Sequence, residues 1–236
     1  MLVMGKNAVR ELLKTEKTVL NITCVDTFND YGILEVAKKK RINVDFINKK
    51  SFINKYGEKA GGVVASVENY QYKVLEEKIA ETKEQENVLF LLLDGLEDPH
   101  NLGAILRSVD ATATDAVIIP KNRSVEITET VVKVSTGATE HVDVIKVTNL
   151  NQTIETLKNN GFWVIGLELT GSIDFKEANY LGKTAIVVGS EGKGIAPLVQ
   201  KNCDVLVKIP MYGKVNSLNA SVSAALILYE AIRQRG

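Results

Sequence analysis

The chain is poor in the residues that build metal centres and disulfide frameworks. It has two cysteines and two histidines, and no CxxC or HxxxH spacing occurs among Cys24, Cys203, His100 and His141. We therefore predict no metal site and no disulfide framework. The chain also lacks any uninterrupted apolar run near the roughly 18 residues that a membrane span requires, so no membrane contact is expected.

An excess of either charge is also missing, since 29 Lys and Arg residues balance 29 Asp and Glu residues. Contact with nucleic acid would therefore come from local basic patches rather than from a global field. The N-terminal residues show no basic segment followed by a long apolar one, as a secretory signal would, and we expect a cytoplasmic protein. With 45% apolar and 25% charged residues, the chain has the composition of a globular protein with a buried core.

Periodicity and charge divide the 236 residues into three parts. Residues 1–70 alternate short helical and β-branched patterns, which predicts a small α/β domain. Residues 71–87 are polar and contain no Gly or Pro, so we expect a linker there, either a charged helical connector or a solvated segment. Residues 88–236 alternate apolar strands with helices, which predicts an α/β domain with a parallel sheet covered on both faces.

The first part carries one dense basic cluster, formed by Lys38, Lys39, Lys40 and Arg41. A helix that ends there would place these cations at the negative end of its dipole, in contact with solvent. The alternative is that the cluster contacts phosphate groups of a nucleic acid. Both interpretations stay open at this point.

Three unusual loops follow apolar strands in the last part and precede helices, at residues 94–109, 187–195 and 209–221. In parallel sheets, ligands bind beyond the carboxyl ends of the strands. In the first loop, Asn101 and Arg107 lie six residues apart, which could bring both to one side of a helix. Arg107 offers a fork of donors suited to phosphate; alternatively, Asn101 caps the helix and Arg107 forms a surface ion pair.

The second loop places Gly189, Gly192 and Gly194 around Glu191. It has neither P-loop nor GxGxxG order, so it indicates either a nucleotide-like ligand or a plain tight turn. In the third loop, the pattern favours Ser217 as the N-cap of the long final helix. A serine nucleophile is not expected, because no GxSxG elbow is present.

Together, the three loops resemble, in order and content, the three motifs of the SpoU/TrmH family of RNA ribose 2′-O-methyltransferases. The similarity is carried by LDGLEDPHNLGAILRSVDA, VVGSEGKG and IPMYGKVNSLNASVSAALILYEAIRQR. Within the family it is greatest to the members that act on a guanosine of 23S rRNA. The N-terminal GKNAVRELL resembles the start of the family's small ribosomal-protein-like RNA-binding domain, and GGVVASV resembles its last strand.

The resemblance implies a deep trefoil knot in the C-terminal parallel-sheet domain (88–236) and an RNA-binding N-terminal domain. It also implies S-adenosylmethionine as methyl donor and a homodimer whose active sites combine residues of both subunits. The implied activity is methyl transfer to the ribose 2′-oxygen of a guanosine in 23S rRNA. Alternatives are a tRNA or another rRNA nucleotide as substrate, a non-catalytic RNA-binding protein of ribosome assembly, or an unrelated nucleotide-dependent enzyme.

Carried over residue by residue, the resemblance implies two groups of site residues. The catalytic group is Asn101, Arg107, Glu191, Ser217 and Asn219. The cofactor-binding group is Thr136, Gly189, Ile209, Met211, Leu218 and Asn219. Since a free guanidinium resists deprotonation, we interpret Arg107 as a clamp on the phosphate of the target nucleotide rather than as a base, with Glu191 and Ser217 orienting Arg107 or the substrate.

Overall fold

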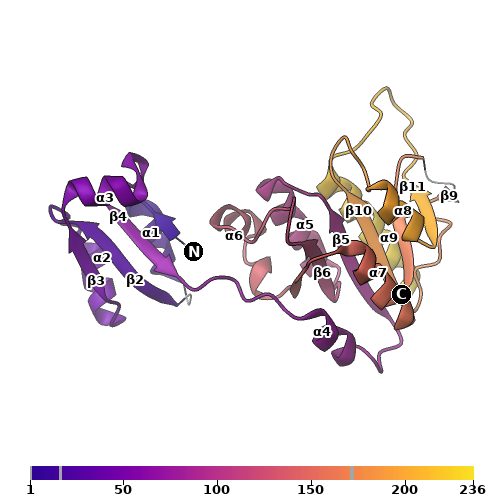
Figure 1. Ribbon diagram of the computed structural model, residues 1–236, viewed down its shortest axis with the longest axis horizontal. Helices are drawn as coiled ribbons and strands as arrows, with labels where there is room; N and C mark the ends of the chain where they lie inside the picture. The colour runs from indigo at the N-terminus through magenta and orange to yellow at the C-terminus, as the bar shows by residue number, and fades with distance from the viewer. Residues whose placement is uncertain (1, 16–17, 171–172) are drawn as a thin grey trace. The chain divides into compact units, whose positions relative to one another are not determined.

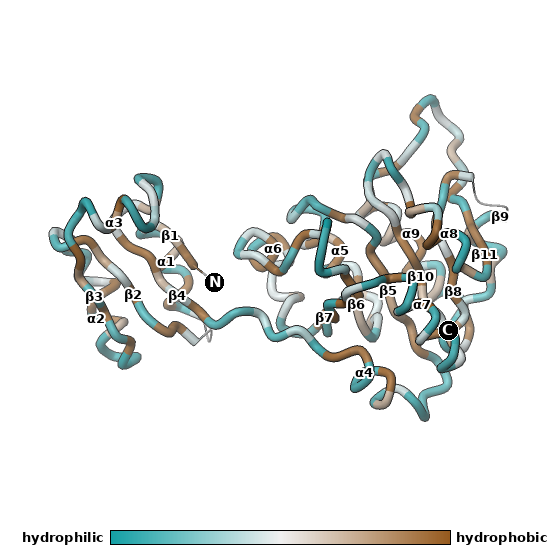
Figure 2. Tube along the Cα trace, viewed as in Figure 1, coloured by the Kyte–Doolittle hydropathy of each residue, from teal (hydrophilic) through white to brown (hydrophobic). Residues whose placement is uncertain are grey.

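The computed structural model describes residues 2–15, 18–170 and 173–236, and the chain forms two compact units, Met1–Gln71 and Tyr72–Gly236 (Figure 1). Each unit is built around its own sheet. Hydrophobic residues are concentrated on the strands of these sheets (Figure 2). Within the described ranges, none of the helices combines the length and the apolar character that a membrane span requires.

The first unit is a four-stranded sheet in the order β1-β4-β2-β3, in which β2 and β3 are parallel and β4 is antiparallel to both β1 and β2. Its elements are β1 Leu2–Met4, α1 Lys6–Leu12, β2 Val19–Val25, α2 Tyr31–Lys39, β3 Val44–Ile47, α3 Lys49–Tyr56, a 3-10 turn Glu58–Ala60 and β4 Val63–Val67. The basic cluster 38–41 lies at the C-terminus of α2, where Lys39 pairs with Glu35 at 2.8 Å. This is the helix-end position that favours cations.

The second unit is a seven-stranded sheet in the order β7-β6-β5-β10-β8-β11-β9, and every neighbouring pair is parallel, which confirms the predicted sheet type. Its strands are β5 Val88–Asp94, β6 Ala116–Pro120, β7 Val144–Val147, β8 Trp163–Leu167, β9 Ile173–Asp174, β10 Lys183–Gly189 and β11 Val205–Lys208. Its helices are α4 Leu75–Glu81, α5 Pro99–Ala111, α6 Glu129–Ser135, a 3-10 turn Ala138–Glu140, α7 Leu150–Asn159, α8 Pro197–Asn202 and α9 Ala220–Arg235.

Successive residues of β5 point to opposite sides of the sheet, and all of Val88–Leu93 are buried. Both faces of this sheet are therefore covered. Phe90 and Leu92 pack in one cluster with Ile154 of α7 and Val199 of α8. Helices α5 and α9 pack against each other. Because the strands are parallel, their carboxyl ends meet at one edge of the sheet, and the three unusual loops leave from this edge.

The segment 71–87, expected to be a linker, is largely folded onto the second unit. Helix α4 buries Leu75 in the core of that unit, and Lys78 pairs with Asp143 at 2.7 Å. Lys73 also bridges to Ile145, the second residue of β7. The boundary between the units therefore lies between residues 71 and 72. Helix α4 belongs to the second unit because its apolar residue Leu75 packs into the core of that unit.

Candidate active site

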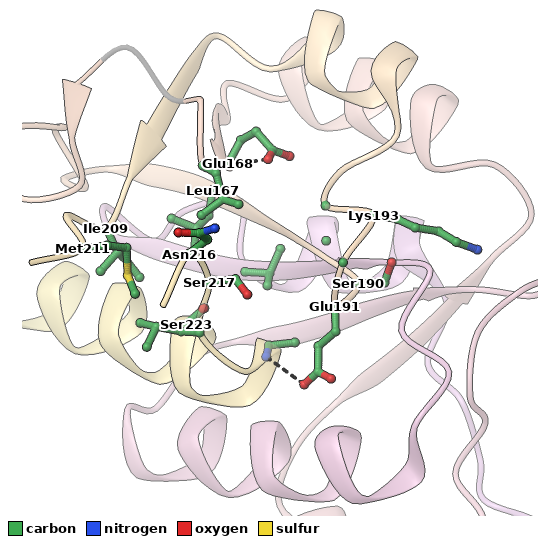
Figure 3. Close-up of a pocket in the computed structure, with 17 residues that line it drawn as sticks. Leu167, Glu168, Ser190, Glu191, Lys193, Ile209, Met211, Asn216, Ser217 and Ser223 are labelled. Atoms are coloured by element: carbon green, nitrogen blue, oxygen red, sulfur yellow. Dashed lines mark hydrogen bonds between the residues drawn. The ribbon is translucent and has the colours of Figure 1, made fainter. Parts of the chain in front are cut away.

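The loops that follow β8, β10 and β11 enclose a cavity of about 300 Å³ at the carboxyl edge of the sheet (Figure 3). Its lining comes from residues 167–169, 188–194, 209, 211, 216–218, 220 and 223. The second and third predicted loops are therefore neighbours in space. Four members of the expected cofactor group line the cavity, namely Gly189, Ile209, Met211 and Leu218.

The glycine-rich loop after β10 is a tight turn and at the same time a wall of the cavity. The amide of Gly194 donates to the carbonyl of Ser190 at 3.0 Å, and Gly192 and Gly194 have φ of 78° and 63°. A Cβ atom on Gly189 would lie 2.1 Å from the carbonyl carbon of Gly194. Both interpretations of this loop are thus compatible, because the turn that needs glycine also forms the cavity wall.

Two carboxylates that the motif analysis missed hold this loop from both sides. Strands β5 and β8 flank β10 in the sheet. Asp94, at the end of β5, accepts a hydrogen bond from the amide of Ala196 at 2.7 Å. Glu168, directly after β8, accepts from the amide of Ile195 at 3.0 Å and from Gln200 Nε2 at 3.2 Å. Their position after apolar strands was the signal that could have identified them.

One residue from each of the three loops joins a shared hydrogen-bond network. Asn101 Nδ2 donates to Glu191 Oε1 at 3.1 Å, and Asn219 Nδ2 donates to Asn101 Oδ1 at 2.9 Å and also to Glu191 Oε1. The amide of Ala220 donates to the same Glu191 oxygen at 3.3 Å, so that Glu191 turns toward the start of α9 (Figure 3). The structure therefore brings together three of the five expected catalytic residues.

The helix caps differ from those that the pattern favoured. Asp98 caps α5, since its Oδ1 accepts from the amide of His100 at 3.0 Å, and Pro99 occupies the first helical turn. Asn219 caps α9, since its Oδ1 accepts from the amide of Ser221 at 2.9 Å. The prediction of Ser217 as N-cap is wrong, as is the alternative of Asn101 as cap. Ser217 is instead exposed and lines the cavity.

Arg107 and Thr136 do not line the cavity. Arg107 is exposed on α5, and in the described part of the chain its side chain makes no hydrogen bond or ion pair. Six helical residues turn by about 600°, which leaves the side chains of Asn101 and Arg107 about 120° apart; Asn101 is accordingly buried. Thr136 ends α6 with a φ of 49° and is exposed.

The chemistry of this site is that of orientation rather than of nucleophilic attack. Neither cysteine lines the cavity, and burial raises the pKa of the Cys24 thiol to about 11 and that of Cys203 to about 12, so both stay protonated near neutral pH. Among the described residues, no three His, Cys, Asp or Glu side chains cluster as metal ligands would. The lining of the cavity combines apolar side chains of Leu167, Ile209 and Met211 with amide, hydroxyl and carboxylate groups.

Both units of the chain match known protein families, and the whole chain is similar to known proteins. Residues 88–229 match the SpoU rRNA Methylase family, and residues 2–73 match the family described as RNA 2′-O ribose methyltransferase substrate binding. A Staphylococcus aureus (strain COL) protein assigned to the TrmH family of tRNA/rRNA methyltransferases is 46% identical over 99% of this chain and 96% of its own length. YacO of Bacillus subtilis (strain 168), assigned to the same family, is 44% identical over 99% and 95%.

Solved structures extend the similarity to the fold. The SpoU methyltransferase AviRb of Streptomyces viridochromogenes, in complex with AdoMet, covers 100% of this chain and 90% of its own, with a TM-score of 0.72 and 26% identity. The TrmH/SpoU tRNA modifying enzyme of A. aeolicus is 33% identical, covers 68% of this chain and 84% of its own, and has a TM-score of 0.58.

Proposed function

Because the chain belongs to the SpoU/TrmH family of RNA methyltransferases, we propose that it transfers a methyl group from S-adenosylmethionine to the ribose 2′-oxygen of a guanosine in 23S rRNA. The observation that carries this proposal is the convergence of the three motif loops. The second and third loops line one cavity, and Asn101 of the first loop joins Glu191 and Asn219 in one hydrogen-bond network beside it.

The residues of the cavity fit S-adenosylmethionine. Ile209, Met211 and Leu218 offer apolar contacts to an adenine ring. A side chain on Gly189 would collide with the backbone of Gly194, so glycine at this position keeps the shape of the loop that forms the cavity wall. Ser217 and Ser223 offer hydroxyl groups to the polar parts of the ligand. When bound, S-adenosylmethionine supplies an electrophilic methyl group on a positively charged sulfur.

The remaining task of the protein is to align the ribose hydroxyl and to accommodate its proton. Glu191, which already accepts hydrogen bonds from Asn101 and Asn219, is held in place to orient that hydroxyl. Arg107 clamps the phosphate of the target nucleotide, and this phosphate or solvent receives the proton. Ser217 lies on the cavity wall, where it contacts the cofactor or the substrate.

We further propose that two copies pair and share their active sites. Helix α9 exposes Val222, Leu226 and Tyr229, which are 46%, 41% and 57% accessible and lie at the spacing of one helix face. Arg107 is exposed on α5, the helix that packs beside α9. A copy bound to this apolar face would bring its own Arg107 toward a neighbouring cavity. Leu226→Glu is then expected to give monomers in sedimentation, whereas Leu198→Glu, on α8, leaves the dimer intact.

The substrate preference rests on the first unit. Residues 2–73 match a substrate-binding family of RNA ribose methyltransferases, whereas the A. aeolicus tRNA modifying enzyme covers only 68% of this chain. This favours rRNA over tRNA, with the 38–41 cluster on phosphates. The trefoil knot, which the resemblance implies for the second unit, is part of the same proposal and is supported by the similarity to SpoU methyltransferase structures.

The test is a map of ribose methylation in rRNA and tRNA from cells with and without this protein. Loss of one 2′-O-methylguanosine from 23S rRNA is the expected result. Loss of a tRNA methyl group instead would establish the alternative substrate, and an unchanged map would overturn the methyltransferase proposal in favour of a non-catalytic role. Calorimetry with S-adenosylmethionine and with ATP distinguishes this cofactor from a phosphorylated one.

A further inference from the structure

A second, larger cavity of about 570 Å³ borders the first. It is lined by residues 94–98, Asn101, Arg123, Ser190, Glu191, Lys193, Gly194, Ala196 and Pro197. Four of these, Ser190, Glu191, Lys193 and Gly194, line the first cavity as well. The glycine-rich loop is thus a wall common to two cavities, and Asn101 faces the second one.

The acidic groups of the second cavity mostly have partners. Asp94 accepts from the amide of Ala196 and Asp98 from that of His100, while Glu191 accepts from Asn101, Asn219 and Ala220. Glu97 is exposed at the rim. A polyanion deep in this cavity would meet four carboxylates, so a favourable contact with anions has to occur where the cations lie.

Two cations line the cavity without a partner. Arg123 and Lys193 are both exposed, and neither makes an ion pair or a side-chain hydrogen bond within the residues that the structure describes. Lys193 points away from the apolar wall formed by Leu167, Ile209 and Met211 (Figure 3). Arg123 follows β6 in the left-handed region, with a φ of 56°, which is uncommon for a residue other than glycine and is frequent at functional sites.

We propose that the second cavity receives the nucleotide whose ribose is methylated, and that Arg123 and Lys193 contact the phosphates beside that ribose. This inference rests on the proposed function, because a transfer between two ligands requires adjacent sites. The shared wall supplies this adjacency, and a volume of about 570 Å³ lies in the range of small-ligand sites. Glu191 and Asn101 then face the ribose, while the two cations bind phosphate from the rim.

The test uses Arg123→Ala and Lys193→Ala in the full chain, with Lys121→Ala as the matched control. Lys121 is an exposed cation on the same loop as Arg123 and lines neither cavity. Methyl transfer from S-adenosylmethionine to rRNA purified from cells lacking this protein is followed at several salt concentrations. Calorimetry with S-adenosylmethionine shows whether each variant keeps the folded cofactor site.

Each cavity variant is expected to raise the KM for RNA about tenfold and to reduce the salt slope of RNA binding by about one, with cofactor affinity unchanged. If Lys193→Ala also weakens cofactor binding, Arg123→Ala decides, since Arg123 does not line the first cavity. Values equal to those of Lys121→Ala would overturn this inference alone. Failure of the unaltered protein to methylate RNA would overturn the proposed function together with it.

Discussion

At the scale of single residues, Gly189 stands where the chain has no room for a side chain. Gly189→Ala would place a methyl group 2.1 Å from the carbonyl carbon of Gly194, so the glycine-rich loop has to shift. We expect the strain in the loop to cost about 1–3 kcal/mol. Because the loop forms a wall of the cavity, this strain should appear as a weaker Kd for S-adenosylmethionine in calorimetry. Gly213→Ala is the control, because its Cβ would meet no atom within 4 Å. Equal affinities of the two variants would show that the loop does not form the cofactor site.

Glu191 presents one carboxylate oxygen to donors from Asn101, Asn219 and Ala220. Glu191→Ala removes the acceptor of all three and releases the groups that orient the ribose, so we expect kcat to fall about 100-fold. Single-turnover methyl transfer measures this change. Glu177→Ala, a substitution at an exposed position outside both cavities, serves as control. A kcat unchanged by Glu191→Ala would remove the network from the mechanism.

Motif content identified Asn101, Glu191 and Asn219 from the sequence, and the structure brings them together. Local pattern was less informative about the role of each residue. Serine is a common N-cap residue, which favoured Ser217. The helix instead begins after Asn219, whose side chain accepts a hydrogen bond from the amide of Ser221. Glu168 escaped the motif analysis, because its partners Ile195 and Gln200 lie 27 and 32 residues away in the chain.

At the scale of elements, the end of α9 carries an acid-sensitive contact. Arg233 donates hydrogen bonds of 2.9 and 2.7 Å to the two carboxylate oxygens of Glu230, and these bonds hold the pKa of Glu230 below its usual range. A carboxyl whose pKa is lower in the folded state stabilises the fold above its unfolded pKa. This stability is lost as the pH falls from about 5 through the folded pKa.

Glu230→Gln is therefore expected to lower the Tm by about 2 °C at neutral pH. It should also remove the part of the acid-induced loss of stability that comes from Glu230. Thermal melts between about pH 3 and pH 7 measure both effects. Glu155→Gln, at an exposed position on α7, is the control. A Tm difference between Glu230→Gln and the unaltered chain that stays constant down to the lowest pH would contradict the assignment.

Long elements with a clear period could be predicted, and short or non-local ones could not. The continuous apolar run of β5 and the capped helix α7 have strong local signals. Strand β9 has two residues, and β1 has three, so neither shows a period. The pairing of β4 with both β1 and β2 in an antiparallel sense depends on contacts between distant segments, which local patterns do not encode.

At the scale of the whole molecule, the division into two units was visible in the charge and period of the sequence, and the first unit, predicted to end at residue 70, ends at Gln71. The membership of the following segment in the second unit was not visible. Residues 73–86 carry five acidic and three basic side chains, a composition that suits a charged helical connector or a solvated linker, and helix α4 lies within this segment. Leu75 and Lys78 nevertheless attach this segment to the second unit through the core and Asp143. Composition does not reveal these contacts, because they join Leu75 and Lys78 to residues far away in the chain.

Pairing of two copies predicts that defects in different subunits complement each other. If Arg107 of one copy serves the site of the other, a dimer of one Arg107→Ala and one Glu191→Ala subunit has one intact site and one site with both defects. A mixed dimer purified with two different tags should then show about half of the unaltered activity. Methyl transfer by this mixed dimer and by both inactive parents is the measurement.

The matched control combines Asn101→Ala with Glu191→Ala. These two residues are joined by a hydrogen bond of 3.1 Å within one copy, so each site of the mixed dimer keeps one defect and activity should stay at the level of the parents. If Arg107 instead acts on the cavity of its own copy, the first mixed dimer will be as inactive as this control. Restored activity in the first pair only is therefore the result that a shared active site requires, because Arg107 lies outside the cavity of its own chain.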